Sequence, residues 1–237
     1  MKYQNYIFDL YGTLVDIHTD EGNLKLWRKM AAAYKKYGAV YTPAKMRKTY
    51  ELLVKEAQKE VDEILIEPVF EKMFTMQNVT VDDETVVEMC HLFRKTSTEY
   101  IRLYPKVLES LDLLRKKGYR LWLLSNAQEV FTRYELRHLG LWAAFDGIYI
   151  SSSFGFRKPD VRFFRSLLEE QQLDPKQCLM IGNDRETDIA GAKAAGLDTF
   201  YMHTALTPND QSPADPENPM EFEGDDWERI VEILCKL

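Results

Sequence analysis

The 237-residue chain contains few cysteines and no long apolar stretch. Its three cysteines, Cys90, Cys178 and Cys235, include no close pair, which is typical of free thiols in a reducing compartment. No segment approaches the ~18 consecutive apolar residues that a membrane-spanning helix needs, and the first residues form no apolar signal region. These absences argue against a disulfide-stabilised secreted protein and against a membrane-spanning protein, and they predict a cytoplasmic location.

Concentrated positive charge is also absent. The formal net charge is −7 and no predicted helix carries a basic stripe, so nucleic acids and anionic membranes are poor candidates for partners. The four histidines show no metal-ligand spacing, and no glycine-rich nucleotide fingerprint follows the first predicted strand. With 45% hydrophobic and 29% charged residues, the composition is that of a globular protein with a large buried core.

Five short runs have the pattern of parallel strands covered on both faces, because consecutive positions are apolar instead of alternating. Helical segments that end at glycines separate the later runs. This alternation predicts an α/β fold with a doubly wound parallel sheet. The predicted strands are Tyr6–Leu10, Arg120–Ser125, Gly147–Ser151, Cys178–Gly182 and Asp198–Met202, and the helices are Pro105–Lys117, Glu129–Leu139, Val161–Gln172 and Glu186–Ala195.

The alternation is interrupted once, after the first strand. From about Asp16 to Ile101 the sequence shows no convincing strand and is rich in residues that favour helix. We therefore predict an inserted helical cap domain over residues 16–100 and a core domain made of residues 1–15 and 101–237. Helices are expected at Asn23–Tyr37, Pro43–Leu65, Val69–Met76, Asp83–Leu103 and Asp225–Cys235, and the proline-containing stretch Thr207–Glu223 is expected to be irregular.

Polar side chains stand where the predicted strands end. The carboxyl ends of parallel strands meet at one edge of the sheet, which is where ligands bind in such folds. The sequence therefore predicts that a carboxylate, a hydroxyl group, a lysine and an acidic pair lie together at that edge. These residues are Asp9, Ser125 with Asn126, Lys158, and Asn183 with Asp184 and Asp188.

In this order the residues resemble the four motifs of the haloacid dehalogenase superfamily. Asp9-Leu10-Tyr11-Gly12-Thr13 is similar to motif I, Ser125 to motif II, Lys158 to motif III, and Gly182-Asn183-Asp184-x-x-x-Asp188 to motif IV. The helical insertion matches the position of the family's cap. The resemblance covers essentially the whole chain and implies a hydrolase acting on a small molecule through a covalent aspartyl intermediate.

The resemblance also implies individual roles. Asp9 is the expected nucleophile, and Lys158 is expected to neutralise charge around it. Catalytic roles are implied for Asp9, Tyr11, Ser125 and Lys158, substrate binding for Thr13, Ser125, Asn126 and Lys158, and Mg²⁺ binding for Asp9, the Tyr11 carbonyl, Asn183, Asp184 and Asp188. Plainer interpretations remain open, because Ser125 and Asp188 also suit helix termini and Lys158 suits a solvated loop.

Two positions depart from the pattern. Tyr11 stands where superfamily phosphatases carry the aspartate that acts as general acid and base, and a phenol of pKa ~10 replaces it poorly. Tyrosine there resembles the 2-haloacid dehalogenases, whose halide leaving group needs no proton and whose halide binds a cap arginine, for which Arg28 and Arg47 are candidates. Asn183 replaces a usual aspartate, but Asp184 and Asp188 keep the region acidic, and three carboxylates beside one lysine favour a bound cation.

Three functions therefore remain open. The preferred one is a Mg²⁺-dependent phosphatase for a small phosphorylated metabolite. The second is a 2-haloacid dehalogenase, and the third is a catalytically weak module that binds a phosphorylated metabolite. Neither the substrate nor the oligomeric state can be inferred from the sequence.

Overall fold

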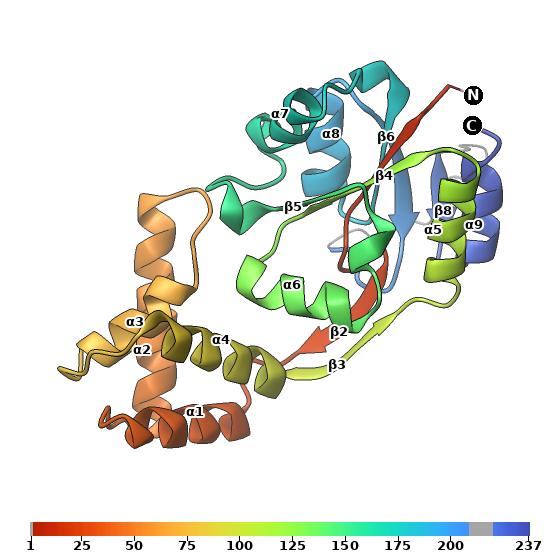
Figure 1. Ribbon diagram of the computed structural model, residues 1–237. Coiled ribbons are helices and arrows are strands. Elements are labelled where there is room, and N and C mark those ends of the chain that lie inside the picture. The colour runs from red at the N-terminus through yellow and green to blue at the C-terminus, as the bar shows by residue number, and fades with distance from the viewer. Residues whose placement is uncertain (1, 209–219) are drawn as a thin grey trace.

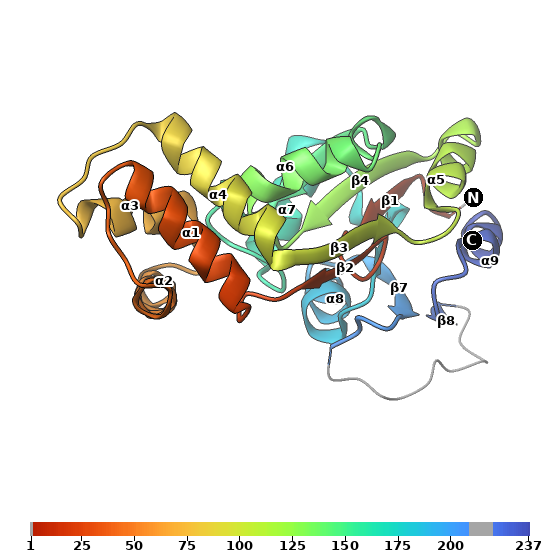
Figure 2. The same cartoon turned by 90° about the horizontal axis from the view of Figure 1, so that it is seen from below.

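The computed structural model describes residues 2–208 and 220–237, which form a sheet-containing core and a helical cap beside it (Figure 1). The sheet has six parallel strands in the order β5-β4-β1-β6-β7-β8, and the cap helices lie to one side of the core in Figure 2. Five of these strands confirm the predicted α/β fold. They are β1 (Asn5–Phe8), β4 (Arg120–Ser125), β5 (Gly147–Ile150), β6 (Cys178–Gly182) and β7 (Asp198–His203).

The central strand shows why the predicted runs are apolar at consecutive positions. In β1, Tyr6 and Phe8 point into one hydrophobic cluster and Ile7 points into the other. Because successive side chains of a strand face opposite sides, a sheet covered by helices on both faces needs apolar residues throughout. One face is covered by α5 (Val107–Lys116), α6 (Glu129–His138) and α9 (Trp227–Leu234), and the other by α7 (Val161–Glu170) and α8 (Gly191–Ala194).

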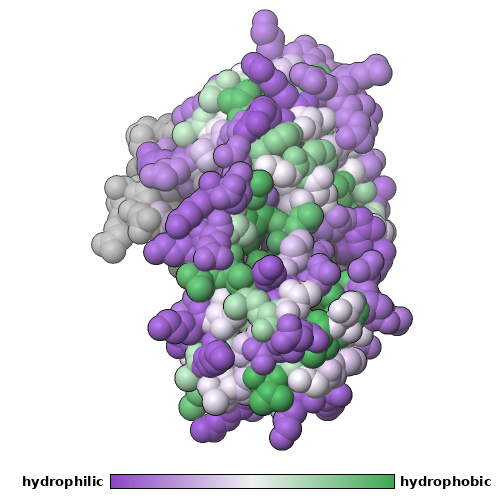
Figure 3. All heavy atoms as spheres, turned by 90° about the vertical axis from the view of Figure 1, so that its left-hand side faces the viewer, coloured by the Kyte–Doolittle hydropathy of each residue, from purple (hydrophilic) through white to green (hydrophobic). Residues whose placement is uncertain are grey.

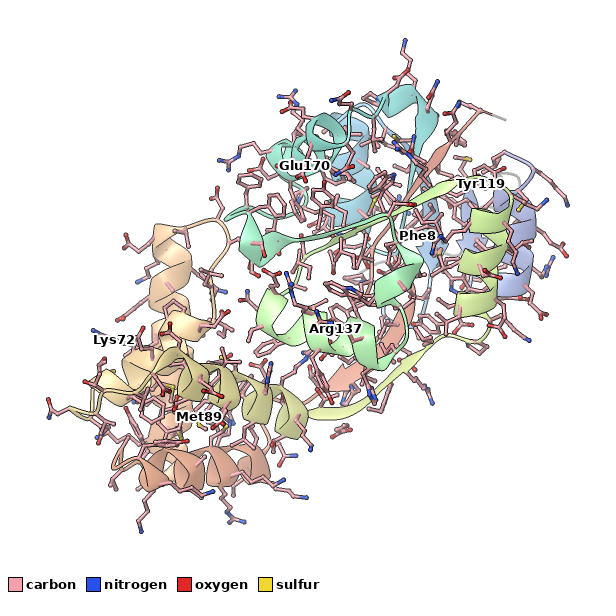
Figure 4. All side chains as sticks on the ribbon, in the orientation of Figure 1. Phe8, Lys72, Met89, Tyr119, Arg137 and Glu170 are labelled. Atoms are coloured by element: carbon pink, nitrogen blue, oxygen red, sulfur yellow. The ribbon has the colours of Figure 1, made fainter. Side chains whose placement is uncertain are left out.

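The cap consists of α1 (Leu24–Lys36), α2 (Pro43–Glu60), α3 (Glu67–Thr75) and α4 (Asp83–Ser97). These helices enclose a hydrophobic cluster into which Phe131 of core helix α6 also packs. Its centre is aromatic, with the rings of Tyr34 and Phe74 stacked 3.9 Å apart. Figure 4 shows Met89 among the cap helices and Phe8 inside the core, where both side chains are buried. None of the helices in the described residues has the length and apolar composition needed to cross a bilayer.

The prediction that residues 16–101 contain no strand is wrong. β2 (Val15–Thr19) pairs antiparallel with β3 (Thr98–Leu103), and this pair carries the chain between core and cap. The helix expected to reach Leu103 ends at Ser97, because the hydroxyl groups of Ser97 and Thr98 both donate to the carbonyl of Arg94 and the backbone then becomes extended.

Three further segments differ from the predictions. α2 ends at Glu60, not at Leu65, because Val61 adopts an extended backbone. The predicted helix Glu186–Ala195 begins as a π-helical segment, Arg185–Ala190, before α8. In the stretch expected to be irregular, β8 (Glu221–Glu223) pairs with β7, while residues 209–219 lie outside the described part of the chain.

Candidate active site

Lys158 is the centre of a buried cluster at the carboxyl end of the sheet. Its Nζ donates hydrogen bonds to Asp9 Oδ1 and Asp188 Oδ1, both at 2.7 Å, and to the carbonyl of Leu124 at 2.8 Å. All three donors of the ammonium group are therefore used. The side chain is only 1% exposed, so this lysine is not a solvated loop residue.

The charges of the cluster do not balance. Burial opposes the positive charge of Lys158, but the carboxylates of Asp188 and Asp9 outweigh burial and raise its pKa. The pKa of Asp188 is raised to about 7, because burial and the nearby charge of Asp9 together outweigh the opposing effect of Lys158. One lysine thus serves two buried carboxylates, which leaves one excess negative charge when both are ionised.

Two buried hydroxyl groups, one from the loop after β1 and one from the end of the neighbouring strand, belong to this edge of the sheet. Thr13 Oγ1 lies 3.2 Å from Asp9 Oδ2 and 3.3 Å from Asn183 Oδ1. Ser125, at the end of β4 next to β1, has a buried hydroxyl group for which the described residues provide no hydrogen-bond partner. Because nearly all buried polar groups in proteins are paired, this hydroxyl is a candidate for binding a ligand.

Asn126 fixes the loop that carries Lys158. Its Nδ2 donates to the Lys158 carbonyl and its Oδ1 accepts from the Lys158 N–H, both at 2.8 Å. Both the nitrogen and the oxygen of the Asn126 side chain are therefore bonded to the backbone of this loop. The contacts therefore indicate that Asn126 positions Lys158.

The two acidic residues that follow β6, Asp184 and Asp188, make different contacts. Asp188 Oδ2 accepts from the N–H groups of Asn183 and Asp184 at 3.1 and 3.0 Å, so both of its oxygens are engaged. Asp184 Oδ1 instead accepts from the N–H groups of Glu186 and Thr187 and caps the following helical turn. The structure therefore brings Asp9 and Asp188 together around Lys158, while the contacts of Asp184 lie within its own loop.

Glycine is required in the nucleophile loop. Gly12 has a φ of +88°, and a Cβ atom there would lie 2.2 Å from Asn183 Nδ2. The glycine thus allows the loop after β1 to approach the Asn183 side chain. This close approach places the Asn183 amide beside Thr13, which also contacts Asp9.

Sequence reasoning did not identify the partners of Tyr11. The Tyr11 hydroxyl donates to Glu135 Oε2 and lies 3.1 Å from Thr132 Oγ1 on α6. Glu135 also accepts from Arg94 of cap helix α4, at 2.6 Å from Nε and 3.2 Å from Nη2. Burial and the negative charge of Glu135 raise the pKa of the Tyr11 hydroxyl well above its ordinary value. No motif marks Glu135 or Arg94, since each looks like an ordinary residue of an amphipathic helix.

A cavity of about 480 Å³ lies between this edge of the core and the cap. Tyr11, Asn126 and Thr132 line it from the core, and Tyr50, Glu63 and Arg94 line it from the cap. Figure 3 shows the side of the molecule that is on the left in Figure 1, and hydrophobic side chains gather in the middle of this face between more hydrophilic regions. Arg28 and Arg47 do not line the cavity. Both are exposed, and Arg47 is paired with Glu51 at 2.6 Å.

Comparison with known proteins places these features in a family. Residues 3–196 match the haloacid dehalogenase-like hydrolase family. A phosphoglycolate phosphatase of Vibrio vulnificus is 30% identical over 82% of this chain and 81% of its own. A glyceraldehyde 3-phosphate phosphatase of Methanothermobacter thermautotrophicus is 31% identical, but over 56% of this chain and 59% of its own length. The solved 2-haloacid dehalogenase of Pseudomonas syringae has the same fold, with a TM-score of 0.69, 20% identity and 99% of both chains covered.

Proposed function

Because the chain belongs to the haloacid dehalogenase-like hydrolase family, we propose that it hydrolyses a small phosphate monoester through a covalent intermediate on Asp9. One observation carries this proposal: Asp9 is held by Lys158, and the neighbouring strand ends at Ser125, whose buried hydroxyl has no hydrogen-bond partner among the described residues. A fixed cation and a free hydrogen-bond donor beside a carboxylate form a cradle for an anionic group. The curated relatives described above, which are phosphatases, support the same reaction.

The residues of the cluster have distinct tasks in this mechanism. An oxygen of Asp9 attacks phosphorus, and water later hydrolyses the resulting acyl phosphate. Lys158 compensates the charge of Asp9 and of the bound phosphoryl group, while Ser125 and Thr13 donate hydrogen bonds to it. Catalysis of phosphoryl transfer consists mostly of positioning and charge compensation, which suits a site whose charged groups are buried and bonded to one another.

Mg²⁺ is part of the proposal. In the described ranges, no three His, Cys, Asp or Glu side chains are arranged to bind a metal. However, the oxygens of Asp9 and Asn183 both lie near Thr13 Oγ1, and the excess negative charge of the cluster favours a hard cation. Asp9, the Tyr11 carbonyl and Asn183 are the proposed ligands, and the contacts of Asp184 and Asp188 support structural roles for these two acids. When bound, Mg²⁺ would neutralise charge on the phosphoryl oxygens.

Hydrolysis of p-nitrophenyl phosphate tests the proposal. We expect activity of the purified protein with Mg²⁺, and its loss in the Asp9→Asn variant and in EDTA. Activity that survives EDTA would contradict the metal assignment alone. Absence of activity in a folded protein that binds inorganic phosphate would contradict the phosphatase and support a binding module.

Dehalogenation is the second candidate, favoured by Tyr11. The Tyr11 hydroxyl is bonded to Glu135, so the usual position of the acid and base holds a group that releases its proton poorly. A halide leaving group needs no proton. Chloride release from 2-chloropropionate by a protein that does not hydrolyse p-nitrophenyl phosphate would establish this alternative.

The three cysteines are free, two buried and one half-buried. Free thiols support our proposal of a reducing, cytoplasmic location.

A further inference from the structure

Cleavage of a phosphate monoester is assisted by a general acid, and the core residues described above do not supply one. When the ester bond breaks, the leaving oxygen carries negative charge, and protonation by a positioned acid accelerates this step. The hydroxyl of Tyr11, at the usual position of the acid, is occupied by Glu135 and Thr132. If the chain is a phosphatase, the acid must come from another residue.

The cavity offers two carboxylic acids among its lining residues, Glu21 and Glu63. Glu21 lies in the turn before α1 and is exposed as a residue, although burial of its carboxyl group raises its pKa. Glu63 belongs to the segment between α2 and α3, and its side chain is only 7% exposed. A buried carboxylic group that lines a substrate-sized cavity opposite Asn126 is the stronger candidate.

Glu63 is fixed on the catalytic loops of the core. Its Oε1 accepts from Gln128 Nε2 at 3.0 Å, and Gln128 stands three residues after Ser125. Gln128 Nε2 also donates to the Ile64 carbonyl at 2.9 Å, and its Oε1 accepts from the Ile66 N–H at 2.9 Å.

A second contact reaches the loop that carries Lys158. Arg157, the residue before Lys158, approaches Glu63 Oε2 at 3.9 Å. The carboxyl group is thus held between the loops that follow β4, which ends at Ser125, and β5, whose loop carries Lys158.

We propose that Glu63 is the general acid and base of the reaction, supplied by the cap instead of the nucleophile loop. This inference rests on the phosphatase function proposed above. An Asp9 oxygen attacks phosphorus, the bond between phosphorus and the ester oxygen breaks, and that oxygen takes the proton of the Glu63 carboxyl group. In the second step the Glu63 carboxylate accepts a proton from water as the water attacks phosphorus, and Asp9 is released as a carboxylate.

The electrostatic environment is consistent with this assignment. Burial raises the pKa of Glu63 above its ordinary value, and the opposing effects of Arg157, Ser151 and Gln128 are smaller. A raised pKa increases the fraction of the group that carries a proton before the first step. The fall of kcat/KM toward high pH, which is the basic limb of the pH profile, then reports the loss of this proton.

Glu63→Gln separates the chemistry of the residue from its structural contact. The glutamine Oε1 can still accept from Gln128, but the side chain can no longer exchange a proton at neutral pH. The matched control is Asp62→Asn, which changes the neighbouring acid. Asp62 is 67% exposed and pairs with Arg162 on the surface, outside the cavity.

The test compares kcat/KM for phenyl phosphate and p-nitrophenyl phosphate, because this ratio reports the steps up to transfer of the phosphoryl group. Phenolate is the poorer leaving group and needs the acid more. In Glu63→Gln we expect kcat/KM for phenyl phosphate to fall by about 100-fold and that for p-nitrophenyl phosphate to fall much less. The loss of wild-type activity toward high pH with phenyl phosphate should disappear in this variant, and Asp62→Asn should retain the wild-type pattern.

The outcomes distinguish the two proposals. If Glu63→Gln lowers kcat/KM for both esters equally, or for neither, Glu63 is not the acid although the chain remains a phosphatase. If the wild-type protein hydrolyses neither ester but releases chloride from 2-chloropropionate, the proposed function fails and the role of Glu63 fails with it. Partial recovery in Glu63→Asp, with the basic limb restored, would support the assignment.

Discussion

The catalytic edge of the core and the cap face opposite it are built in different ways. At the core edge, Asp9, Lys158 and Asp188 follow or lie close to buried strands and are bonded to one another. Across the cavity, Glu63 comes from an irregular segment and Arg94 from the last turn of a helix. The sheet thus fixes the proposed reactive groups, whereas a loop and a helix end bring the cap groups to the cavity. The two sides should therefore respond differently to substitution.

The largest effect is expected from Lys158→Met. The substitution leaves Asp9 and Asp188 buried side by side without a cation, and breaking such a buried ion pair costs about 3–5 kcal/mol of unfolding free energy. Urea denaturation gives the stability, and hydrolysis of p-nitrophenyl phosphate should be lost in protein that remains folded. The control is Lys29→Met, at an exposed position of α1. Equal stability of wild type and Lys158→Met would mean that the core edge is not held by this charge cluster.

A smaller loss is expected where core and cap meet at Glu135. Glu135→Gln weakens the contacts to Arg94 and Tyr11, and leaving the partly buried guanidinium poorly paired costs about 1–3 kcal/mol. In a double-mutant cycle with Arg94→Met, the two changes should cost clearly less together than the sum of the single effects. Glu129→Gln is the matched control, because the Glu129–Arg133 pair lies on the same helix and is more exposed. Additive effects would show that cap and core are independent at this point.

The core was predictable because its signals are local. Each central strand is a continuous apolar run, and parallel strands deliver the residues after them to one edge. The proximity of Asp9 and Lys158, which lie 149 residues apart, follows from this rule. The role of Asp184 did not follow, because an acid at that spacing suits a metal ligand and a helix cap equally well.

The connection to the cap was not predictable from local patterns. β2 and β3 are stabilised by pairing between residues such as Asp16 and Arg102, which are 86 positions apart, so neither strand shows a strong signal of its own. The same applies to Arg94 and Glu135, whose contact depends on how two helices cross. Arg28 and Arg47 were equally plausible from the sequence, and only the fold shows that they point away from the cavity.

Gln128→Leu tests the other contact between the two sides. It removes three hydrogen bonds that hold the segment around Glu63 and Ile66. We expect the free energy of local opening of this segment to fall by about 1 kcal/mol. Hydrogen exchange at the Ile66 amide, which donates to Gln128, should accelerate severalfold, and KM should rise more than kcat falls. Unchanged exchange would show that other contacts hold the segment closed. Gln171→Leu, which removes a single bond to Tyr149 in the core, is the control.

The smallest difference is expected between two buried thiols in the unmodified protein. Cys90 lies in cap helix α4 and Cys178 begins the central strand β6. Burial raises the pKa of both thiols, that of Cys178 to about 12, so each reacts with a thiol reagent mainly after local opening. Central strands open at higher free energy than peripheral helices. In dilute urea we therefore expect Cys90 to be labelled severalfold faster than Cys178.

Mass spectrometry of the labelled peptides resolves the sites, and the half-buried Cys235 should react first as an internal reference. Faster labelling of Cys90 would mean that the cap opens while the sheet stays intact, so that the cavity can admit substrate without disturbing Asp9 and Lys158. Equal rates for Cys90 and Cys178 would mean that cap and core open as one cooperative unit. In that case the contacts of Glu135 and Gln128, together with the packing of Phe131 into the cap cluster, join the two sides into one unit.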